Sequence, residues 1–269
     1  MSAPQIASAA NPRIRAAARL RDRGARDEAG LTIVDGGREV RRAVEARVTV
    51  EEAFVCEALV RTDDAQAAVR ALDAAGTRIW TTSKAAFAKV AFGERAEGVV
   101  AIVRIPSTDI ASLRLPEDPL VVVLEAVEKP GNLGAVLRSA DGAGADALIL
   151  ADPRTDPFNP NAIRASAGTV FTVPIATASS KEVRDWLRGQ GIRMVAARVD
   201  AQTDPWDADL RGPLAIALGS EANGLGATWS TKDTTAVRLP MHGVADSLNV
   251  SVAAAVLLYE ARRQRGQRS

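Results

Sequence analysis

The sequence predicts an α/β protein in two parts, the second of which holds a mostly parallel sheet. Predominantly apolar runs at residues 120–127 and 214–218 are typical of strands that are buried on both faces. Helical patterns alternate with these strand-like runs. A segment with three prolines and little periodicity, residues 104–119, divides the chain. Together these observations predict two domains joined by a linker.

The first part is expected to be a small α/β domain over residues 1–105. Asn11 and Pro12 predict the start of a basic helix, which Gly24 is expected to end. Thr62 is expected to cap another helix, which Gly76 closes. The remaining elements are a helix at 39–46 and strands at 31–34, 53–56, 78–80 and 99–105.

The second part is expected to be a domain over residues 120–269, after a linker at 106–119. Its strands are predicted at 120–127, 147–150, 194–199, 214–218 and 236–239. One helix is predicted at 133–143, and Ser180 is expected to cap the next, which Gly191 ends. A long helix from about residue 247 to 264 closes the chain.

The composition is that of a soluble globular protein, with 47% apolar and 25% charged residues. No apolar run approaches the ~20 residues that span a bilayer. Residues 1–11 lack the apolar core of a signal peptide. The single cysteine, Cys56, excludes an internal disulfide and suits a reducing compartment. We therefore expect a cytoplasmic protein without a membrane partner.

Several common chemistries are excluded by what the sequence lacks. With His242 as the only histidine, a zinc site of several His and Cys ligands cannot form, and no metal is expected. No Gly-x-Ser-x-Gly elbow supplies a hydrolase serine. Neither a Gly-x-Gly-x-x-Gly loop nor a P-loop is present, which argues against an NAD or ATP enzyme of common type.

The charge distribution is uneven although the net charge is only +1. Between residues 11 and 26 there are six arginines and one acidic residue, Asp22. Such a cluster fits a local phosphate-binding face, and it fits a solvated helix surface equally well. The candidates for substrate binding within it are Arg13, Arg15, Arg19 and Arg23.

Three conspicuous loops each follow a predicted strand, at residues 128–138, 217–225 and 239–251. Open α/β sheets bind ligands at the carboxyl ends of their strands. Taken singly, each loop also fits a capped helix start or a plain turn, with Asn132 as a possible cap in the first. In the third loop, a cap at Asp246 or Ser247 leaves Asn249 and Ser251 unexplained on a largely apolar helix.

In this order the three loops resemble the motifs of the SpoU/TrmH branch of the SPOUT methyltransferases. The first resembles Asn-x-Gly-x-x-x-Arg, through Asn132, Gly134 and Arg138. The second resembles Leu-Gly-x-Glu-x-x-Gly-Leu from Leu218 to Leu225. The third, from Pro240 to Ser251, resembles Pro-Met followed by Ser-Leu-Asn-Val-Ser, and residues 160–168 are similar to the family as well.

The resemblance implies an S-adenosylmethionine-dependent RNA 2′-O-methyltransferase. It implies a deep trefoil knot in the second domain and a homodimer that completes the active site. The first domain is similar in pattern to an L30e-like RNA-binding module, chiefly at residues 30–39. Ribosomal RNA is the first expected substrate and transfer RNA the second. A catalytically inactive RNA-binding relative is the main alternative, against which the intact motif residues argue.

The resemblance also implies roles for individual residues. Those expected to bind the cofactor are Leu218, Gly219, Glu221, Gly224, Leu239, Met241 and Leu248. Those expected around the reacting centre are Asn132, Arg138, Glu221, Ser247 and Asn249. A guanidinium stays protonated in proteins, so we expect Arg138 to grip a phosphate rather than to act as a base. No catalytic role is expected for His242.

Overall fold

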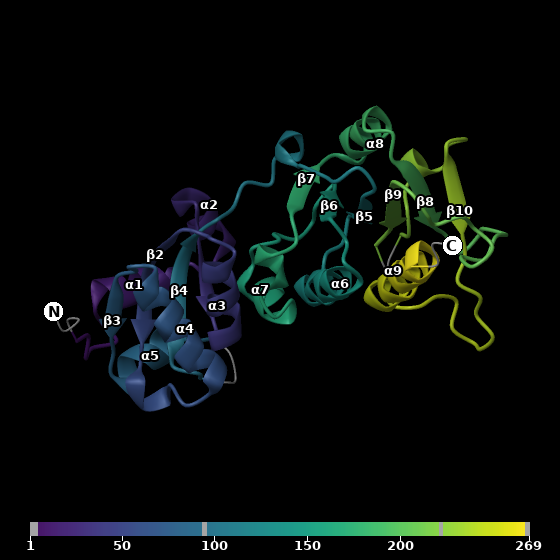
Figure 1. Cartoon of the computed structure of the whole chain (residues 1–269). Coiled ribbons are helices and arrows are strands. Elements are labelled where there is room, and N and C mark those ends of the chain that lie inside the picture. The colour runs from purple at the N-terminus through teal and green to yellow at the C-terminus, as the bar shows by residue number, and fades with distance from the viewer. Residues whose placement is uncertain (1–4, 93–95, 221–222, 267–269) are drawn as a thin grey trace. The chain divides into compact units, whose positions relative to one another are not determined.

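The computed structural model describes residues 5–92, 96–220 and 223–266. The chain separates into two compact units (Figure 1). The first comprises Met1–Pro106 and Asp156–Thr172, and the second comprises Ser107–Thr155 and Val173–Ser269. Of the expected linker at 106–119, residues 107–119 belong to the second unit, and Ile110, Leu113 and Leu115 pack against its core. None of the described helices is long and apolar enough to cross a membrane.

The first unit is built on a mixed four-stranded sheet with the order β1-β4-β2-β3. Strand β4 pairs antiparallel with β1 and β2, and β3 pairs parallel with β2. The strands are β1 (Leu31–Asp35), β2 (Val50–Val55), β3 (Ile79–Thr81) and β4 (Val99–Arg104). The helices are α1 (Pro12–Arg19), α2 (Arg23–Ala29), α3 (Gly37–Glu45), α4 (Asp63–Ala74) and α5 (Lys84–Val90).

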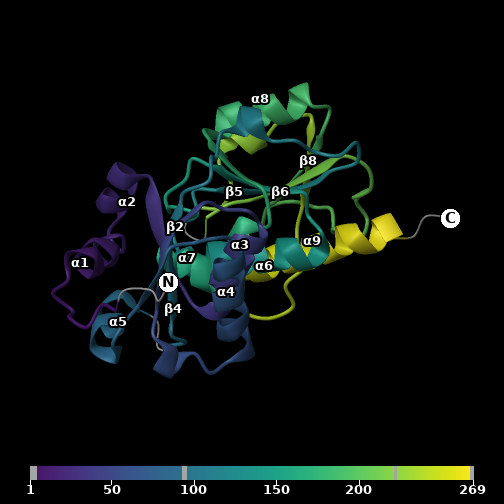
Figure 2. The ribbon, with the colours of Figure 1, turned by 60° about the vertical axis from the view of Figure 1, so that its left-hand side comes forward.

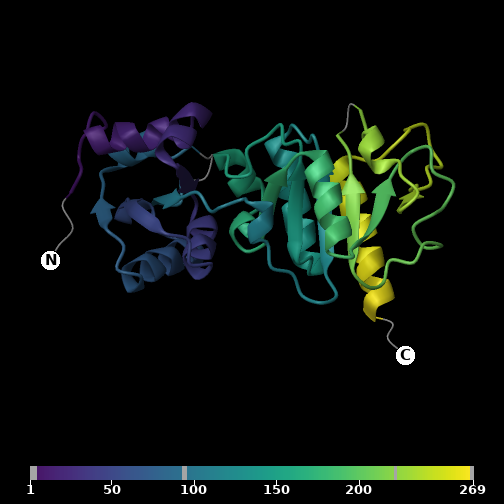
Figure 3. The same ribbon diagram turned by 90° about the horizontal axis from the view of Figure 1, so that it is seen from above.

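Two layers of helices enclose this sheet (Figure 3). Helices α1 and α5 cover one face, where Ile14 and Phe87 join Ile33 and Phe54 of the strands in one buried cluster. Helices α3 and α4 pack together on the other face. The buried Cys56 belongs to the first cluster.

The segment Asp156–Thr172 lies in the first unit although it falls, in sequence, between two strands of the second. It carries α7 (Pro160–Ala165), which packs beside β1. Arg26, only 1% exposed, binds Asp156 through Nε and Nη2 at 2.9 and 2.7 Å. Thr32 donates to the carbonyl of Phe158 at 2.8 Å. An ion pair of the buried Arg26 and a hydrogen bond from a side chain to the backbone therefore hold this segment on the first unit.

The second unit is a six-stranded sheet in which every ladder is parallel, with the order β10-β8-β9-β5-β6-β7. This confirms the predicted α/β class with a parallel sheet. The strands are β5 (Leu120–Glu125), β6 (Ala147–Ala151), β7 (Ile175–Ala178), β8 (Arg193–Ala197), β9 (Leu214–Leu218) and β10 (Thr234–Val237).

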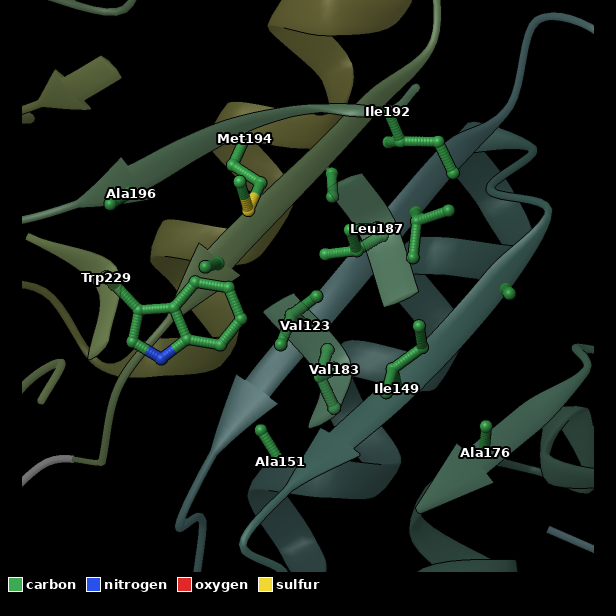
Figure 4. Close-up of a cluster of buried hydrophobic side chains, with 14 residues drawn as sticks. Val123, Ile149, Ala151, Ala176, Val183, Leu187, Ile192, Met194, Ala196 and Trp229 are labelled. Carbon is green, nitrogen blue, oxygen red and sulfur yellow. The ribbon is translucent and has the colours of Figure 1, made fainter. Parts of the chain in front are cut away.

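Helices cover both faces of this sheet (Figures 1 and 2). Helix α8 (Ser180–Gly189) covers one face, while α6 (Pro130–Ala143) and α9 (Val250–Gly266) lie side by side on the other. The core beneath α8 includes Val183, Leu187, Val123 and Trp229 (Figure 4). Strands covered on both sides are largely apolar, which explains the apolar runs in the sequence.

Several local predictions were wrong. Gly24 lies inside α2 rather than after one long basic helix. Ser179, not Ser180, caps α8, because its hydroxyl and the carboxylate of Glu182 form a reciprocal capping box. Asn132 does not cap α6, since Lys129 occupies that position without a side-chain hydrogen bond.

Candidate functional site

The three motif loops emerge from the same edge of the six-stranded sheet. They follow β5, β9 and β10, and all ladders of this sheet are parallel, so the carboxyl ends of the strands share one edge. Strand β8 lies between β9 and β10, so its own carboxyl end completes the row. The fold thus gathers segments more than a hundred residues apart at the edge where such sheets bind ligands.

A pocket of about 600 Å³ opens at this edge. It is lined by the end of β9, the residues after β8 and β10, and the start of α9. Five of the residues expected to bind a cofactor line it, namely Leu218, Gly219, Gly224, Leu239 and Leu248. Met241 is half-buried and does not line this pocket, and Glu221 lies outside the described residues.

The second motif forms a tight turn at the pocket wall. The backbone N–H of Gly224 donates to the carbonyl of Ser220 at 2.9 Å, and the N–H of Asn223 reaches the Ser220 hydroxyl at 3.3 Å. A Cβ on Gly219 would overlap the backbone of Gly224, and Gly224 itself has a φ of +63°. Both glycines are therefore required by the backbone path.

The third motif begins α9, and here the structure explains a residue that the sequence left unexplained. Asn249 Oδ1 accepts from the backbone N–H of Ser251 at 2.9 Å and from its hydroxyl at 2.7 Å. Asn249 is therefore the cap of α9, in place of the expected Asp246 or Ser247. Ser247 is exposed and lines the pocket.

The same Asn249 side chain reaches the first motif. Its Nδ2 donates to Asn132 Oδ1 at 3.4 Å. Because the N–H of Ser251 donates to Asn249, the atom of Asn249 on that side must be the oxygen, Oδ1. Its Nδ2 therefore faces Asn132, which must present its own Oδ1 to accept. Asn132 Nδ2 is then buried and has no hydrogen-bond partner among the described residues. The first and third motifs are thus joined side chain to side chain.

Arg138 lies on the exposed side of α6. Across the described part of the chain its guanidinium makes no hydrogen bond or ion pair. The guanidinium of Arg138 is thus available to a bound anion, whereas the side chain of Asn132 already accepts a hydrogen bond from Asn249. Within the described ranges, no group of three or more His, Cys, Asp or Glu side chains is placed to hold a metal ion.

Sequence reasoning missed two arginines that line the pocket, Arg198 and Arg238. Arg198 is neutralised by a bidentate pair with Asp200, both bonds being 2.9 Å, and hydrogen bonding to this carboxylate raises the pKa of Arg198. Each follows the last residue of its strand in the structure, β8 or β10, whereas the strands predicted at 194–199 and 236–239 enclosed both arginines.

The six arginines between residues 11 and 26 divide into three groups. Arg13 pairs with Glu52 at 3.1 Å and stacks on Trp80, and Arg23 lies 3.6 Å from Asp27. Arg15 and Arg19 are exposed and have no partner among the described residues. Arg21 and Arg26 are used structurally, because Arg21 donates to the last carbonyls of α5 and Arg26 binds Asp156.

Two family profiles match the chain. Residues 119–259 match the SpoU rRNA Methylase family, and residues 11–101 match the MRM3-like substrate binding domain. The first match covers more than half of the chain and contains all three motifs.

Curated and solved relatives agree with these matches. The 23S rRNA (guanosine(2553)-2′-O)-methyltransferase RlmP of Bacillus subtilis is 28% identical over 96% of this chain and 99% of its own length. A crystal structure of an RNA 2′-O ribose methyltransferase is 42% identical with a TM-score of 0.85, covering 97% of this chain and 98% of that one.

A third relative was solved with a cofactor. The SpoU methyltransferase AviRb from Streptomyces viridochromogenes, in complex with AdoMet, is 31% identical with a TM-score of 0.84 and covers 96% of this chain and 100% of that one. The membership inferred from the three motifs is confirmed: the chain belongs to the SpoU rRNA methylase family.

Proposed function

We propose that this chain transfers the methyl group of S-adenosylmethionine to a ribose 2′-hydroxyl of ribosomal RNA. The class, an RNA ribose 2′-O-methyltransferase that uses this cofactor, is confirmed by the family match and by relatives that carry this activity or hold AdoMet. Ribosomal RNA is favoured over transfer RNA because RlmP, which aligns with nearly the whole chain, acts on 23S rRNA.

One observation carries the proposal for this chain in particular. The pocket at the strand ends is lined by the second and third motifs, and Asn249 joins the first motif to the third at Asn132. A volume of about 600 Å³ lies in the range of small-molecule sites. Its apolar residues Leu218, Leu239 and Leu257 suit the adenine ring.

The charged lining residues suit the other end of the cofactor. Arg238 lines the pocket, and its guanidinium makes no ion pair or hydrogen bond among the described residues. Asp246 also lines it, as an exposed carboxylate. The amino-acid part of S-adenosylmethionine carries a carboxylate and an ammonium group, which these side chains could pair. We infer that Leu218, Gly219, Gly224, Leu239 and Leu248 hold the cofactor, together with Met241 and Glu221.

The bound cofactor supplies an electrophilic methyl group, and the protein must place the ribose oxygen in line with it. We infer that Asn132, Asn249, Ser247 and Glu221 surround the reacting ribose. Arg138 is exposed and unpaired among the described residues, which suits a grip on an RNA phosphate. A phosphate held there fixes the ribose, and the positive charge of the guanidinium lowers the proton affinity of the ribose hydroxyl.

We further propose that residues 1–105 bind the RNA substrate, joined through 106–119 to the catalytic domain at 120–269. The match to a substrate binding domain at residues 11–101 supports this. Arg15 and Arg19, one helical turn apart on α1, offer unpaired cations. Arg13 and Arg23 are partly neutralised and contribute less.

We also propose a homodimer formed through α9. Val252, Val256 and Tyr259 follow at spacings of four and three residues and are 47%, 40% and 55% exposed. Residues so spaced share one helix face. A Cβ on Gly142 of α6 would lie 2.9 Å from the Tyr259 hydroxyl. Tyr259 of α9 thus lies directly against a glycine of α6, so the two helices adjoin at this surface. An apolar helix face of this kind fits a second copy.

The family match also supports two properties that remain proposals. We propose that the C-terminal segment of the catalytic domain threads into a trefoil knot, since the match to residues 119–259 includes the last strand and most of the last helix. We propose a cytoplasmic location, in keeping with one buried free cysteine and a ribosomal substrate.

The test is calorimetric titration of the purified chain with S-adenosylmethionine, followed by transfer of tritiated methyl to total ribosomal and transfer RNA. We expect binding and labelled ribosomal RNA, with the label on a ribose after digestion. Label confined to transfer RNA would overturn the proposed substrate. The absence of cofactor binding would overturn the proposed activity and favour an RNA-binding relative without catalysis.

A further inference from the structure

A buried carboxylate lies beside the cofactor pocket, at a position to which no motif assigns a role. Glu125 is the last residue of β5, and it is 7% exposed. Its strand pairs with β9, where Leu124 lies opposite Leu218. Glu125 therefore sits one residue beyond a strand pair whose β9 partner already lines the pocket.

Both oxygens of this carboxylate accept hydrogen bonds. Oε2 accepts from the backbone N–H of Gly226 at 2.5 Å, and Oε1 accepts from Trp229 Nε1 at 2.9 Å. The Ser180 hydroxyl also lies 2.6 Å from Oε1, and it lies equally near Asp152 Oδ2. A hydroxyl has one proton to donate, so the two N–H groups are the constant donors to Glu125.

The two N–H donors, Gly226 and Trp229, belong to the segment that directly follows the turn at the pocket wall. Gly226 follows the turn of Gly219, Ser220 and Gly224 by two residues, and Trp229 is buried in the core beneath α8 (Figure 4). A Cβ on Gly226 would lie 3.3 Å from both carboxylate oxygens. The turn begins at the end of β9, and directly after it the backbone N–H of Gly226 is bound to Glu125 at the end of β5.

We propose that Glu125 is a positioning residue that fixes the shape of the cofactor pocket by holding the exit of this turn at Gly226. It acts through the turn and does not touch the cofactor. The proposal rests on the proposed function, because it assumes that the pocket binds S-adenosylmethionine. The chemistry requires a carboxylate, since each of its two oxygens accepts from a different N–H donor.

An amide cannot replace this carboxylate. In Glu125→Gln, the one carbonyl oxygen can face Gly226 or Trp229, and the amide NH₂ then faces the other N–H. Either arrangement leaves two donors in contact within a buried site. If Trp229 is replaced by phenylalanine as well, the carbonyl can face Gly226 and the NH₂ can face the ring and Ser180.

The experiment compares the full-length wild type with Glu125→Gln, Trp229→Phe and the double variant. Cofactor dissociation constants are measured by calorimetry at a temperature where circular dichroism shows every variant folded. We expect Glu125→Gln to weaken binding by about tenfold or more and the double variant to recover most of the loss. The KM for the cofactor should rise more than kcat falls.

Asp152→Asn is the matched control, because it removes the other carboxylate at Ser180 and no bond to the turn. Its dissociation constant should stay within about twofold of wild type. Wild-type affinity in Glu125→Gln, failure of the double variant to recover, or an equal loss in Asp152→Asn would each overturn the proposal. If the wild type itself binds no cofactor, the proposed function fails first and this inference with it.

Discussion

The side chain of Asn249 donates to that of Asn132 across 3.4 Å, which joins two motifs 117 residues apart. Asn249 also caps α9 through Ser251, so one amide serves the helix and the contact together. These two tasks can be separated by mutation, because capping uses its oxygen and the contact uses its nitrogen.

Asn249→Asp should keep the helix and damage catalysis. Aspartate caps as well as asparagine, so stability should remain within about 0.5 kcal/mol of wild type. Aspartate cannot donate to Asn132, and the Asn132 amide must reverse to meet it. We expect methyl transfer to fall by about tenfold or more. Ser251→Ala, which removes only a hydroxyl, is the control; full activity in Asn249→Asp would show that the contact is dispensable.

Arg138→Ala should separate cofactor binding from transfer. Arg138 does not line the cofactor pocket, so the cofactor dissociation constant should change little. Loss of a cation that holds the substrate should reduce transfer by about 100-fold. Calorimetry and tritium transfer measure the two effects. Arg138→Lys should recover only part of the activity, because lysine lacks the planar fork. Equal losses of binding and transfer would assign Arg138 to the cofactor instead.

Replacement of Arg15 and Arg19 by alanine should weaken RNA binding and flatten its salt dependence. Each phosphate contact adds about 0.9 to the slope of log K against log salt, so the slope should fall by about 2. Filter binding over a salt series gives the slope. Arg61→Ala with Arg70→Ala, two exposed arginines elsewhere in the first unit, changes the charge equally. An equal effect of both pairs would mean that α1 is not the RNA face.

Glu39 gives the first unit a pH-dependent penalty. Burial raises its pKa, and the nearby Glu97 adds to this, while Arg164 and Arg38 oppose it. The folded state therefore holds the proton more tightly, and stability falls as pH rises from about 4.3 through the raised pKa. Glu39→Gln, which cannot ionise, should unfold at higher urea than wild type at neutral pH.

The advantage of Glu39→Gln should vanish below the ordinary glutamate pKa, where the wild-type side chain is protonated in both states. Exposed Glu28→Gln should change stability by less than about 0.5 kcal/mol at any pH. A constant difference between wild type and Glu39→Gln across the pH series would contradict the assignment.

Val256→Asp should convert a dimer into monomers, because it places a charge in the apolar face of α9. Sedimentation at several concentrations measures the change, and methyl transfer should be lost with it if the site is shared between subunits. Trp206→Asp alters a comparably exposed apolar residue in the loop after β8 and should leave the mass unchanged. A monomeric wild type would rule out the proposed dimer.

The alternation of strands and helices was readable from the sequence because it depends on local periodicity. The runs at β5 and β9 are apolar, except for the terminal Glu125 of β5, since helices cover both faces of their sheet. The helix ends were less accurate: Gly24 is a poor helix residue, yet it lies within α2. Tertiary packing outweighs a local preference of that size.

The sequence by itself determined the parallel α/β class, the three motif loops and the arginine-rich start of the chain. Only the tertiary structure decided which of those arginines are already paired, why Asn249 stands where it does, and that Glu125 holds the turn at Gly226. Periodicity and turn chemistry act between residues a few positions apart. The partners of a buried amide or carboxylate come from distant segments, and they meet only when the chain is packed.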